Sequence, residues 1–242
     1  MFGDKIKKIY KKLLYGYRST SESYIKYLKK KGVTIGENVT FYEPNTNYID
    51  VQKPWIVKIG NNVEIARGVV IITHDYAWSV IKQINGEIIG SRGKVEIGNN
   101  VFIGMNTMIM QGVSIGDNVI IGANTLVNKD IPANSVAVGN PVRVVSSIED
   151  YTKKRKTKYI EEAKELFLEY YKQYNKIPDK KIFDEFFWMF EQRNLNNLSK
   201  EFINKMKLTG NWEKTKNKFL NTEPYFNGYE KFVEYCMKGE TN

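Results

Sequence analysis

Residues 97–132 of the chain read IGNNVF-IGMNTM-IMQGVS-IGDNVI-IGANTL-VNKDIP, so that an aliphatic residue opens each of six consecutive six-residue units. A fixed period of this kind is the sequence signature of a repeat architecture. An amphipathic helix would repeat near 3.6 residues, which a period of six does not match. The stretch therefore predicts a solenoid built from short strands.

The residue three positions after each aliphatic one indicates how the solenoid turns. These residues are Asn100, Asn106, Gly112, Asn118, Asn124 and Asp130. Glycine lacks a Cβ atom, and Asn and Asp form local hydrogen bonds, so all three types tolerate left-handed backbone angles. Between these positions, the aliphatic and β-branched residues fit a short strand that faces a narrow interior. The pattern predicts a β-solenoid of triangular cross-section.

The units resemble the hexapeptide repeats of the left-handed parallel β-helix acyltransferases. Residues 127–144, VNKDIPANSVAVGNPVRV, are similar to the last coil of the sugar O-acetyltransferases in that family. The resemblance covers residues 33–148 and implies a mainly β fold, a left-handed parallel β-helix. A fold hosts many functions, so the substrate has to be argued from the site.

The chain divides by composition into three segments. We expect an N-terminal helical cap at 1–31, the β-helix at 32–148 and a C-terminal α-helical extension at 149–242, where apolar residues fall at helical spacing. Such an extension would cover the far end of the solenoid or pack on its flank.

An external loop interrupts the solenoid. The pattern stops at His74, and the aliphatic position resumes at Ile97, 26 residues after Ile71. Since 26 is not a multiple of six, part of this segment must leave the solenoid, and we place the loop at about 75–94. A long loop beside the single histidine of the chain is where function usually concentrates.

Positive charge gathers at the N-terminus. Of the formal net charge of +10, residues 1–31 carry +8, and the first helix has lysines between its apolar positions. Two interpretations stay open, namely a helix that caps the solenoid with a solvated basic face and a helix that lies on an anionic membrane. The sequence contains no nucleic-acid-binding motif, so a nucleic-acid partner is not expected.

The sequence predicts a cytoplasmic protein, either free or peripheral at the inner face of the membrane. No apolar run approaches the length of a membrane span, and the basic N-terminus lacks the apolar core of a signal peptide. The single Cys236 allows no internal disulfide, which agrees with a reducing compartment.

His74 is the candidate general base. Acyl transfer to a hydroxyl needs a group that takes the hydroxyl proton, and imidazole suits this because its ordinary pKa is about 6.5. The Thr-His pair at a coil corner is similar to the catalytic position of the acyltransferase family. Asp75 and Glu87 are both candidates to orient the ring, and the sequence does not choose between them.

The family resemblance also implies the acyl donor and its contacts. The donor would be acetyl-CoA, held between subunits of a homotrimer, with the Met105 amide after Gly104 as oxyanion donor. Further cofactor contacts would fall on Ala123, whose small side chain admits the pantetheine arm, and on Asn128, Lys129 and Arg143 near the nucleotide end. Cations attract phosphates in this way. No metal is expected.

The acceptor contacts are less specific. An asparagine on an early coil binds the acceptor in sugar acetyltransferases, and Asn45 and Asn47 are both in the comparable stretch. The run Thr-His-Asp-Tyr-Ala-Trp looks like capsule and surface-polysaccharide O-acetyltransferases, which places Tyr76 and Trp78 beside the sugar.

These observations predict an acetyl-CoA-dependent O-acetyltransferase that acts on a sugar hydroxyl, of a bacterial capsular or other surface polysaccharide or of its precursor. His74 would act as the general base in a ternary complex, in which the acceptor attacks acetyl-CoA directly. An N-acetyltransferase for an amino sugar is the alternative, since the same base and donor site serve either nucleophile. A second alternative is a non-catalytic, structural or membrane-docking solenoid. A carbonic anhydrase on this scaffold is excluded, because its zinc site takes three histidines and this chain has one.

Overall fold

The computed structural model describes residues 10–238, and these fall into two compact units. The first ends at Tyr151 and the second begins at Thr152. The boundary lies within the long helix α4 (Ile148–Tyr174).

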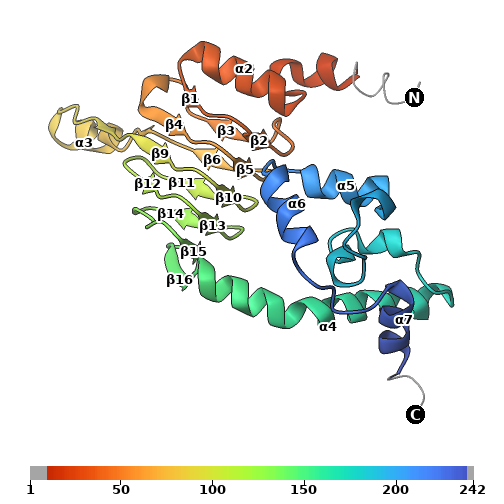
Figure 1. The fold of residues 1–242 in the computed structure, drawn as a ribbon. Coiled ribbons are helices and arrows are strands. Elements are labelled where there is room, and N and C mark those ends of the chain that lie inside the picture. The colour runs from red at the N-terminus through yellow and green to blue at the C-terminus, as the bar shows by residue number, and fades with distance from the viewer. Residues whose placement is uncertain (1–9, 239–242) are drawn as a thin grey trace. The chain divides into compact units, whose positions relative to one another are not determined.

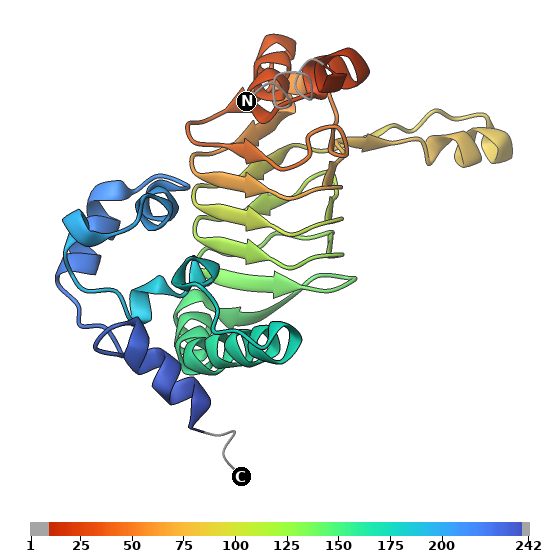
Figure 2. The ribbon, with the colours of Figure 1, turned by 90° about the vertical axis from the view of Figure 1, so that its right-hand side faces the viewer.

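The first unit is a solenoid of stacked parallel strands (Figures 1 and 2). The first sheet has the order β1 (Thr34–Ile35), β4 (Val57–Ile59), β9 (Val95–Ile97) and β12 (Ser114–Ile115). The second has β2 (Thr40–Phe41), β5 (Val63–Ile65), β10 (Val101–Ile103), β13 (Val119–Ile121), β15 (Ser135–Val138) and the antiparallel β16 (Arg143–Ser147). The third has β3 (Tyr48–Ile49), β6 (Val70–Ile71), β11 (Met108–Ile109) and β14 (Leu126–Val127). Three stacked parallel sheets are typical of the left-handed β-helix, so the predicted fold class is confirmed.

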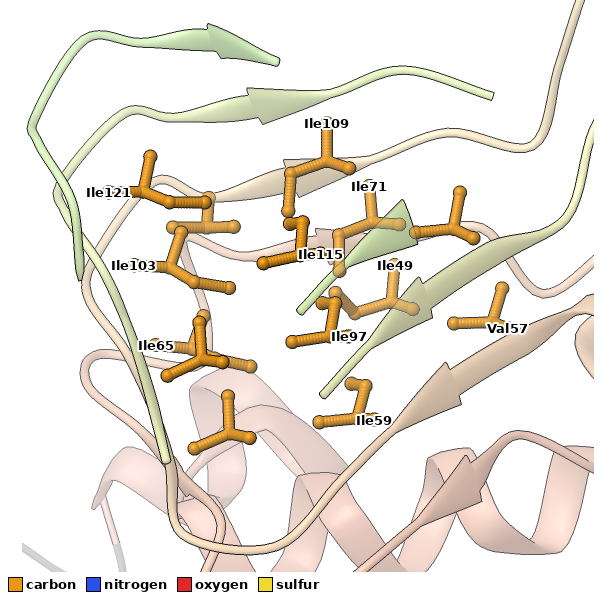
Figure 3. Packing of buried hydrophobic residues seen from close by; sticks show 14 of the residues in the cluster. Ile49, Val57, Ile59, Ile65, Ile71, Ile97, Ile103, Ile109, Ile115 and Ile121 are labelled. Atoms are coloured by element: carbon orange, nitrogen blue, oxygen red, sulfur yellow. The ribbon is translucent and has the colours of Figure 1, made fainter. Parts of the chain in front are cut away.

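The aliphatic residues of the repeat fill the interior (Figure 3). They stack in columns because each pairs with its equivalent in the next coil, as Ile65 does with Ile103 and Ile103 with Ile121. The buried set includes Ile59, Ile65, Ile71, Ile97, Ile103, Ile109, Ile115 and Ile121. Burying each isoleucine contributes about 1.5–3 kcal/mol, so the regular stack is the main source of stability of this unit.

Asparagine and glycine form most of the corners. Left-handed φ angles occur at Asn38, Asn62, Asn100, Asn106, Asn118, Asn124 and Asn134, and at Gly68 and Gly112. The sequence pattern includes Asp130 in this set, but its φ is not positive. Its carboxylate instead accepts a hydrogen bond of 2.7 Å from the Ser114 amide. Asp130 therefore ties two coils together rather than turning the chain.

The insertion after His74 forms an arm that projects from the solenoid (Figure 2). Val101 pairs with Val63 in the coil before it and with Val119 in the coil after it. Many more residues separate Val63 from Val101 than separate Val101 from Val119. The excess is the stretch of chain that leaves the coil. The arm contains β7 (His74–Asp75), the helix α3 (Trp78–Asn85) and β8 (Ser91–Arg92), and β7 and β8 form an antiparallel ribbon at its base.

The helix at residues 21–31 covers the start of the solenoid. Tyr24 and Leu28 of α2 (Ser21–Lys31) are fully buried in the solenoid core. Residues 10–15 are helical and precede the turn η1 (Gly16–Arg18), but Leu13 is 80% exposed. The apolar positions Ile6 and Ile9 lie outside the described residues. Contact of this first helix with a membrane stays a prediction.

The second unit has an aromatic core of its own. After α4 come the short turns η3 (Lys180–Phe183), η4 (Phe187–Met189) and η5 (Leu195–Asn197), and then α5 (Lys200–Lys207), α6 (Trp212–Leu220) and α7 (Tyr229–Met237). Its fully buried rings include Phe167, Phe183, Phe202, Phe219 and Phe232. Cys236 is also buried, which raises the pKa of its thiol to about 12 and leaves it unreactive.

One predicted helix of this unit is absent. The α-helical spacing expected for the C-terminal extension includes residues 182–190, but the structure has the turns η3 and η4 there. Phe183, Phe187, Met189 and Phe190 are all buried, whereas on an α-helix Met189 would lie about 100° around the axis from Phe190. Among the described residues, no helix is long and apolar enough to cross a membrane.

Candidate active site

His74 lies at the corner where the coil opens into the arm. We call this the arm corner, and it contains the residues that follow the third sheet in each coil, including Asp50, His74, Gln111 and Lys129. His74 starts β7 directly after the buried Thr73. Its side chain is only 12% exposed. The ring is therefore held against the solenoid with a small part of its surface open to solvent.

Asp50 orients the His74 ring. The Oδ2 atom of Asp50 lies 2.6 Å from the His74 Nδ1 atom, and the Asp50 side chain is completely buried. The same oxygen accepts hydrogen bonds from the amide and the hydroxyl of Thr73, and Oδ1 accepts one of 2.9 Å from the Gln52 amide. Both oxygens of this carboxylate are thus occupied by donors.

These donors keep Asp50 ionised. Burial raises the pKa of this carboxyl, but the hydrogen bonds from Thr73, Gln52 and His74 outweigh burial, so its pKa lies below the ordinary value. An ionised carboxylate only accepts hydrogen bonds, so the Nδ1 atom of His74 must carry the proton. The Nε2 atom of the neutral ring then has a free lone pair, as a general base requires.

The sequence-based prediction of the orienting carboxylate is therefore wrong. The Asp75 carboxylate accepts hydrogen bonds of 2.9 Å from the Ala77 amide and from the Gln111 side chain. Those donors, with the Ala77 amide foremost, lower the pKa of Asp75. Glu87 lies on the arm and accepts a hydrogen bond of 2.6 Å from Asn85. Both carboxylates stabilise the arm rather than the imidazole.

A cavity of about 320 Å³ opens beside His74. It is lined by His74, Asp75, Tyr76, Trp78, Gly90, Ser91 and Arg92. The His74 and Tyr76 rings make an edge contact with centroids 5.5 Å apart, and Tyr76 and Trp78 lie 5.9 Å apart. The structure thus brings both predicted acceptor aromatics to the base. A larger hollow of about 950 Å³ lies along the first sheet, and its lining contains no histidine.

The two candidate asparagines differ in what their side chains can do. Asn47 is buried, its Nδ2 atom donates to the Tyr42 carbonyl, and its Oδ1 atom accepts from the Val69 amide at 2.8 Å. Its polar atoms are thus used inside the solenoid, so it is a structural residue and not an acceptor contact. Asn45 is half-buried and stays available.

The residues expected around the acyl group lie at a different corner. Gly104, Met105 and Ala123 follow the second sheet, as Asn45 does, and we call this the Met105 corner. A Cβ atom on Gly104 would lie 2.5 Å from the Ala123 amide nitrogen, so only glycine permits this spacing of the coils. Among the described residues, the Met105 amide has no hydrogen-bond acceptor. It is a free N–H outside the ladder of bonds between coils.

The expected phosphate contacts divide between the two corners. Asn128 and Lys129 follow β14 at the arm corner and are exposed. Arg143 begins β16 opposite Val138, whose side chain lies beside Gly122 of the Met105 corner. Neither Lys129 nor Arg143 has an ion-pair partner among residues 10–238.

One chain alone does not bring the base and the expected oxyanion donor together. The two corners are at opposite ends of the third sheet. Within one coil, the segment from Met105 to Gln111 joins them. At about 3.3 Å per residue, this is roughly 20 Å. His74 and Met105 therefore share a site only if the Met105 corner of a second copy meets the arm corner of the first.

Sequence reasoning missed Asp50 and gave no role to Arg92. Asp50 lies one coil before His74, in a coil whose repeat is irregular around η2 (Pro54–Ile56). Ile49 pairs with Ile71, so Asp50 lies directly beneath the corner that carries Thr73 and His74. Counting the coils through the irregular region would have identified Asp50.

Among the described residues, no three of His, Cys, Asp and Glu lie close enough to hold a metal.

The repeats of this solenoid match a known family. The sequence model of a family described as bacterial transferase hexapeptide (six repeats) matches residues 94–129. Protein CapG of Staphylococcus aureus is 41% identical over 158 residues, which cover 65% of this chain and 86% of CapG. The galactoside O-acetyltransferase of Escherichia coli (strain K12) is 35% identical over 121 residues, which cover 50% of this chain and 57% of that enzyme.

Among solved structures, a galactoside acetyltransferase in complex with coenzyme A is 31% identical, with a TM-score of 0.42, and the match covers 62% of this chain and 84% of that one. The match to CapG spans most of that protein, and the repeat model falls within the same solenoid. The chain therefore belongs to the family of hexapeptide-repeat acetyltransferases and is an acyltransferase.

Proposed function

We propose that the protein transfers the acetyl group of acetyl-CoA to a hydroxyl of a sugar in a bacterial capsular or other surface polysaccharide, or in its precursor. The observation that carries the proposal is the Asp50–His74 hydrogen bond, which leaves a basic nitrogen beside an aromatic cavity. The likeness to a galactoside O-acetyltransferase supports a sugar acceptor.

His74 is the general base of the proposed reaction. Its Nε2 atom takes the proton of the acceptor hydroxyl while the oxygen attacks the thioester carbonyl carbon. Asp50 stabilises the imidazolium that forms, because a buried carboxylate lies 2.6 Å from Nδ1. The C–S bond then breaks, and the proton on Nε2 passes to the departing thiolate of CoA. A base positioned in this way contributes about 10²–10⁴-fold to the rate.

The Met105 amide stabilises the charge on the carbonyl oxygen. A backbone N–H without an acceptor in the free protein is preorganised for an oxyanion and needs no rearrangement during the reaction. Gly104 holds this amide in place because no larger residue permits the close packing on Ala123. Lys129 and Arg143, which have exposed charges, would hold the phosphates of CoA.

The active unit is a homotrimer in this proposal. The base is at the arm corner and the oxyanion donor is at the Met105 corner, so neighbouring copies must each supply one half. Heterologous contacts of this kind close into a ring when the rotation between copies is right. Each trimer would then hold three identical sites between subunits.

The test is thiol release from acetyl-CoA with a panel of mono- and oligosaccharides, comparing wild type with His74→Ala. We expect sugar-dependent release that falls by about two orders of magnitude or more in the variant. Release that does not change in the variant would remove His74 from the mechanism. Amino sugars in the same panel, with the product analysed for ester or amide, separate O-transfer from N-transfer.

A further inference from the structure

We propose that the acceptor carries an anionic group close to the acetylated hydroxyl, and that Arg92 binds this group. The inference rests on the proposed function, since it names the class of acceptor that the same site takes. Its evidence is the position and the surroundings of Arg92 in the cavity beside His74.

The ribbon at the base of the arm sets Arg92 beside the base. His74 of β7 is paired directly with Arg92 of β8, and Asp75 is paired with Ser91. Side chains that are directly opposite in an antiparallel pair project from the same face, with Cβ atoms about 4.5–5.5 Å apart. Arg92 therefore projects to the side of the ribbon that carries the imidazole.

The opposite face of the ribbon holds the one acidic group in the cavity lining. Asp75 and Ser91 lie together there, and the Gln111 side chain donates a hydrogen bond to each of them. The Asp75 Oδ1 atom is also used, because it accepts from the Ala77 amide. The Asp75 carboxylate is thus directed at the solenoid and at its own backbone, and not at the guanidinium.

Arg92 has no anionic partner within the part of the chain that the structure describes. No ion pair or hydrogen bond there satisfies its guanidinium, and apart from His74 it is the one basic side chain that lines this cavity. By contrast, Arg155 is tied to Glu162, and Arg193 is tied to three backbone carbonyls. An unpaired arginine beside a catalytic base is suited to a charged ligand.

The chemistry of the guanidinium defines the class of that ligand. Its planar fork binds two oxygens of a carboxylate or a phosphate at once, with a strength that neutral hydroxyls do not reach. The anion lies within the length of one sugar from the reacting hydroxyl, because Arg92 and His74 are opposite each other. The shared chemistry is a sugar oxyanion, either the carboxylate of a uronic acid or the phosphate of a sugar phosphate.

The experiment compares acceptors that share the galactose ring and differ in the anionic group that they carry. Acetyl transfer is measured with galactose, galacturonic acid and galactose 1-phosphate, for wild type, Arg92→Gln and Arg92→Lys. Lys82→Gln is the matched control, since it removes one positive charge from the same arm outside the cavity. The two charged acceptors distinguish carboxylate from phosphate.

We expect wild type and Lys82→Gln to prefer one of the acidic sugars over galactose in kcat/KM. Arg92→Gln should raise the KM for that acidic sugar by about 10- to 100-fold, as expected for a lost hydrogen bond to a charged group. The KM for acetyl-CoA should not change, and Arg92→Lys should restore part of the preference. Equal kcat/KM for all three sugars would overturn the proposal, and so would a rise confined to the KM for acetyl-CoA.

A second measurement separates this proposal from the proposed function. Calorimetric binding of galacturonic acid and galactose 1-phosphate to His74→Ala, with and without Arg92→Gln, needs no turnover. If wild type transfers acetyl to none of the sugars but anion binding still requires Arg92, the proposed function is wrong and the anion site remains. Transfer to neutral sugars, without Arg92-dependent binding of either anion, would do the reverse.

Discussion

At the scale of single residues, Asp50 decides what His74 can do. A histidine at a coil corner has two nitrogens, and either one can carry the proton in the neutral ring. The buried carboxylate fixes the proton on Nδ1 and also the direction of the ring. Thr73 and Gln52 also donate to that carboxylate, so the pair is supported by the solenoid itself and not by the arm.

Replacing Asp50 with Asn should reduce kcat by about 10²-fold or more, which is the lower end of what a general base contributes. The amide removes the negative charge and can donate to Nδ1, which favours the unproductive tautomer. Glu87→Gln is the control, because Glu87 contacts Asn85 on the arm. Steady-state kinetics of both variants, with thermal unfolding to check the fold, provide the measurement. A larger loss in Glu87→Gln than in Asp50→Asn would contradict this assignment.

The lowered pKa of Asp50 also predicts how stability depends on pH. The folded-state pKa lies below 3.8, the ordinary value that applies to the unfolded chain. Asp50 therefore stabilises the fold fully above that ordinary value, and the contribution is lost as pH falls through the lower folded value. The difference in free energy of unfolding between wild type and Asp50→Asn should therefore shrink as the pH falls below about 5. Denaturant unfolding from about pH 3 to pH 7 measures this, and a difference that grows in acid would be inconsistent with it.

At the scale of elements, the coils give the site its precision, and the arm gives it a cavity. Coil corners are fixed by left-handed asparagines, whose side chains also bond from coil to coil, as Asn100 does to Asn118 and Asn118 to Asn134. The arm is attached at its base by Gln111, which bonds to both of its strands. Tyr76 and Trp78 are part of the arm, and their side chains complete the wall of the cavity.

Gly104→Ala should destabilise the solenoid by about 1–3 kcal/mol, the usual cost of inserting an atom into packed structure. The added Cβ would lie 2.5 Å from the Ala123 nitrogen and 2.7 Å from the Gly122 carbonyl carbon, so the backbone must move. That movement displaces the Met105 amide, and kcat should fall as well. Gly90→Ala is the matched control for stability, since a Cβ there meets no atom within 4 Å. Chemical denaturation of both variants gives the comparison, and equal stability would show that coil spacing is not limited at Gly104.

At the scale of the whole molecule, the proposed trimer takes the two halves of its site from different copies of the solenoid. His74 and Asp50 are at the arm corner, and Met105 and Ala123 are at the Met105 corner, with the third sheet between them. The unit that contains residues 152–238 has a separate aromatic core.

Mixing two inactive variants should therefore restore activity. His74→Ala removes the base, and Ala123→Trp blocks the other corner. In a mixed trimer, an intact arm corner meets an intact Met105 corner at some interfaces. We expect co-expressed variants to regain a measurable fraction of wild-type turnover, and the mass in solution to be near three times 28.1 kDa. A monomeric protein, or the absence of complementation in mixed oligomers, would contradict the intersubunit site.

The solenoid, most of its corners and the place of His74 follow from the amino-acid sequence alone. A six-residue period with Asn or Gly at the turns is a local property, because each coil repeats the same backbone angles and buries the same aliphatic position. The interruption after His74 is equally visible, since the repeat stops there and resumes out of phase. The aromatic pair Tyr76 and Trp78 can also be predicted from the sequence, because both residues lie close to His74 along the chain.

Which polar groups meet depends on the tertiary fold. Asp50 contacts His74 from the preceding coil because parallel stacking superimposes one coil on the next, and an irregular corner hides that register from a count along the chain. Asp75 is the nearer carboxylate in sequence, but the alternation of a strand directs it to the face opposite the imidazole. Arg92 comes beside the base only because the arm folds back as an antiparallel ribbon. Chemistry at this site depends on contacts between segments, and these follow from coil stacking and strand pairing rather than from proximity along the chain.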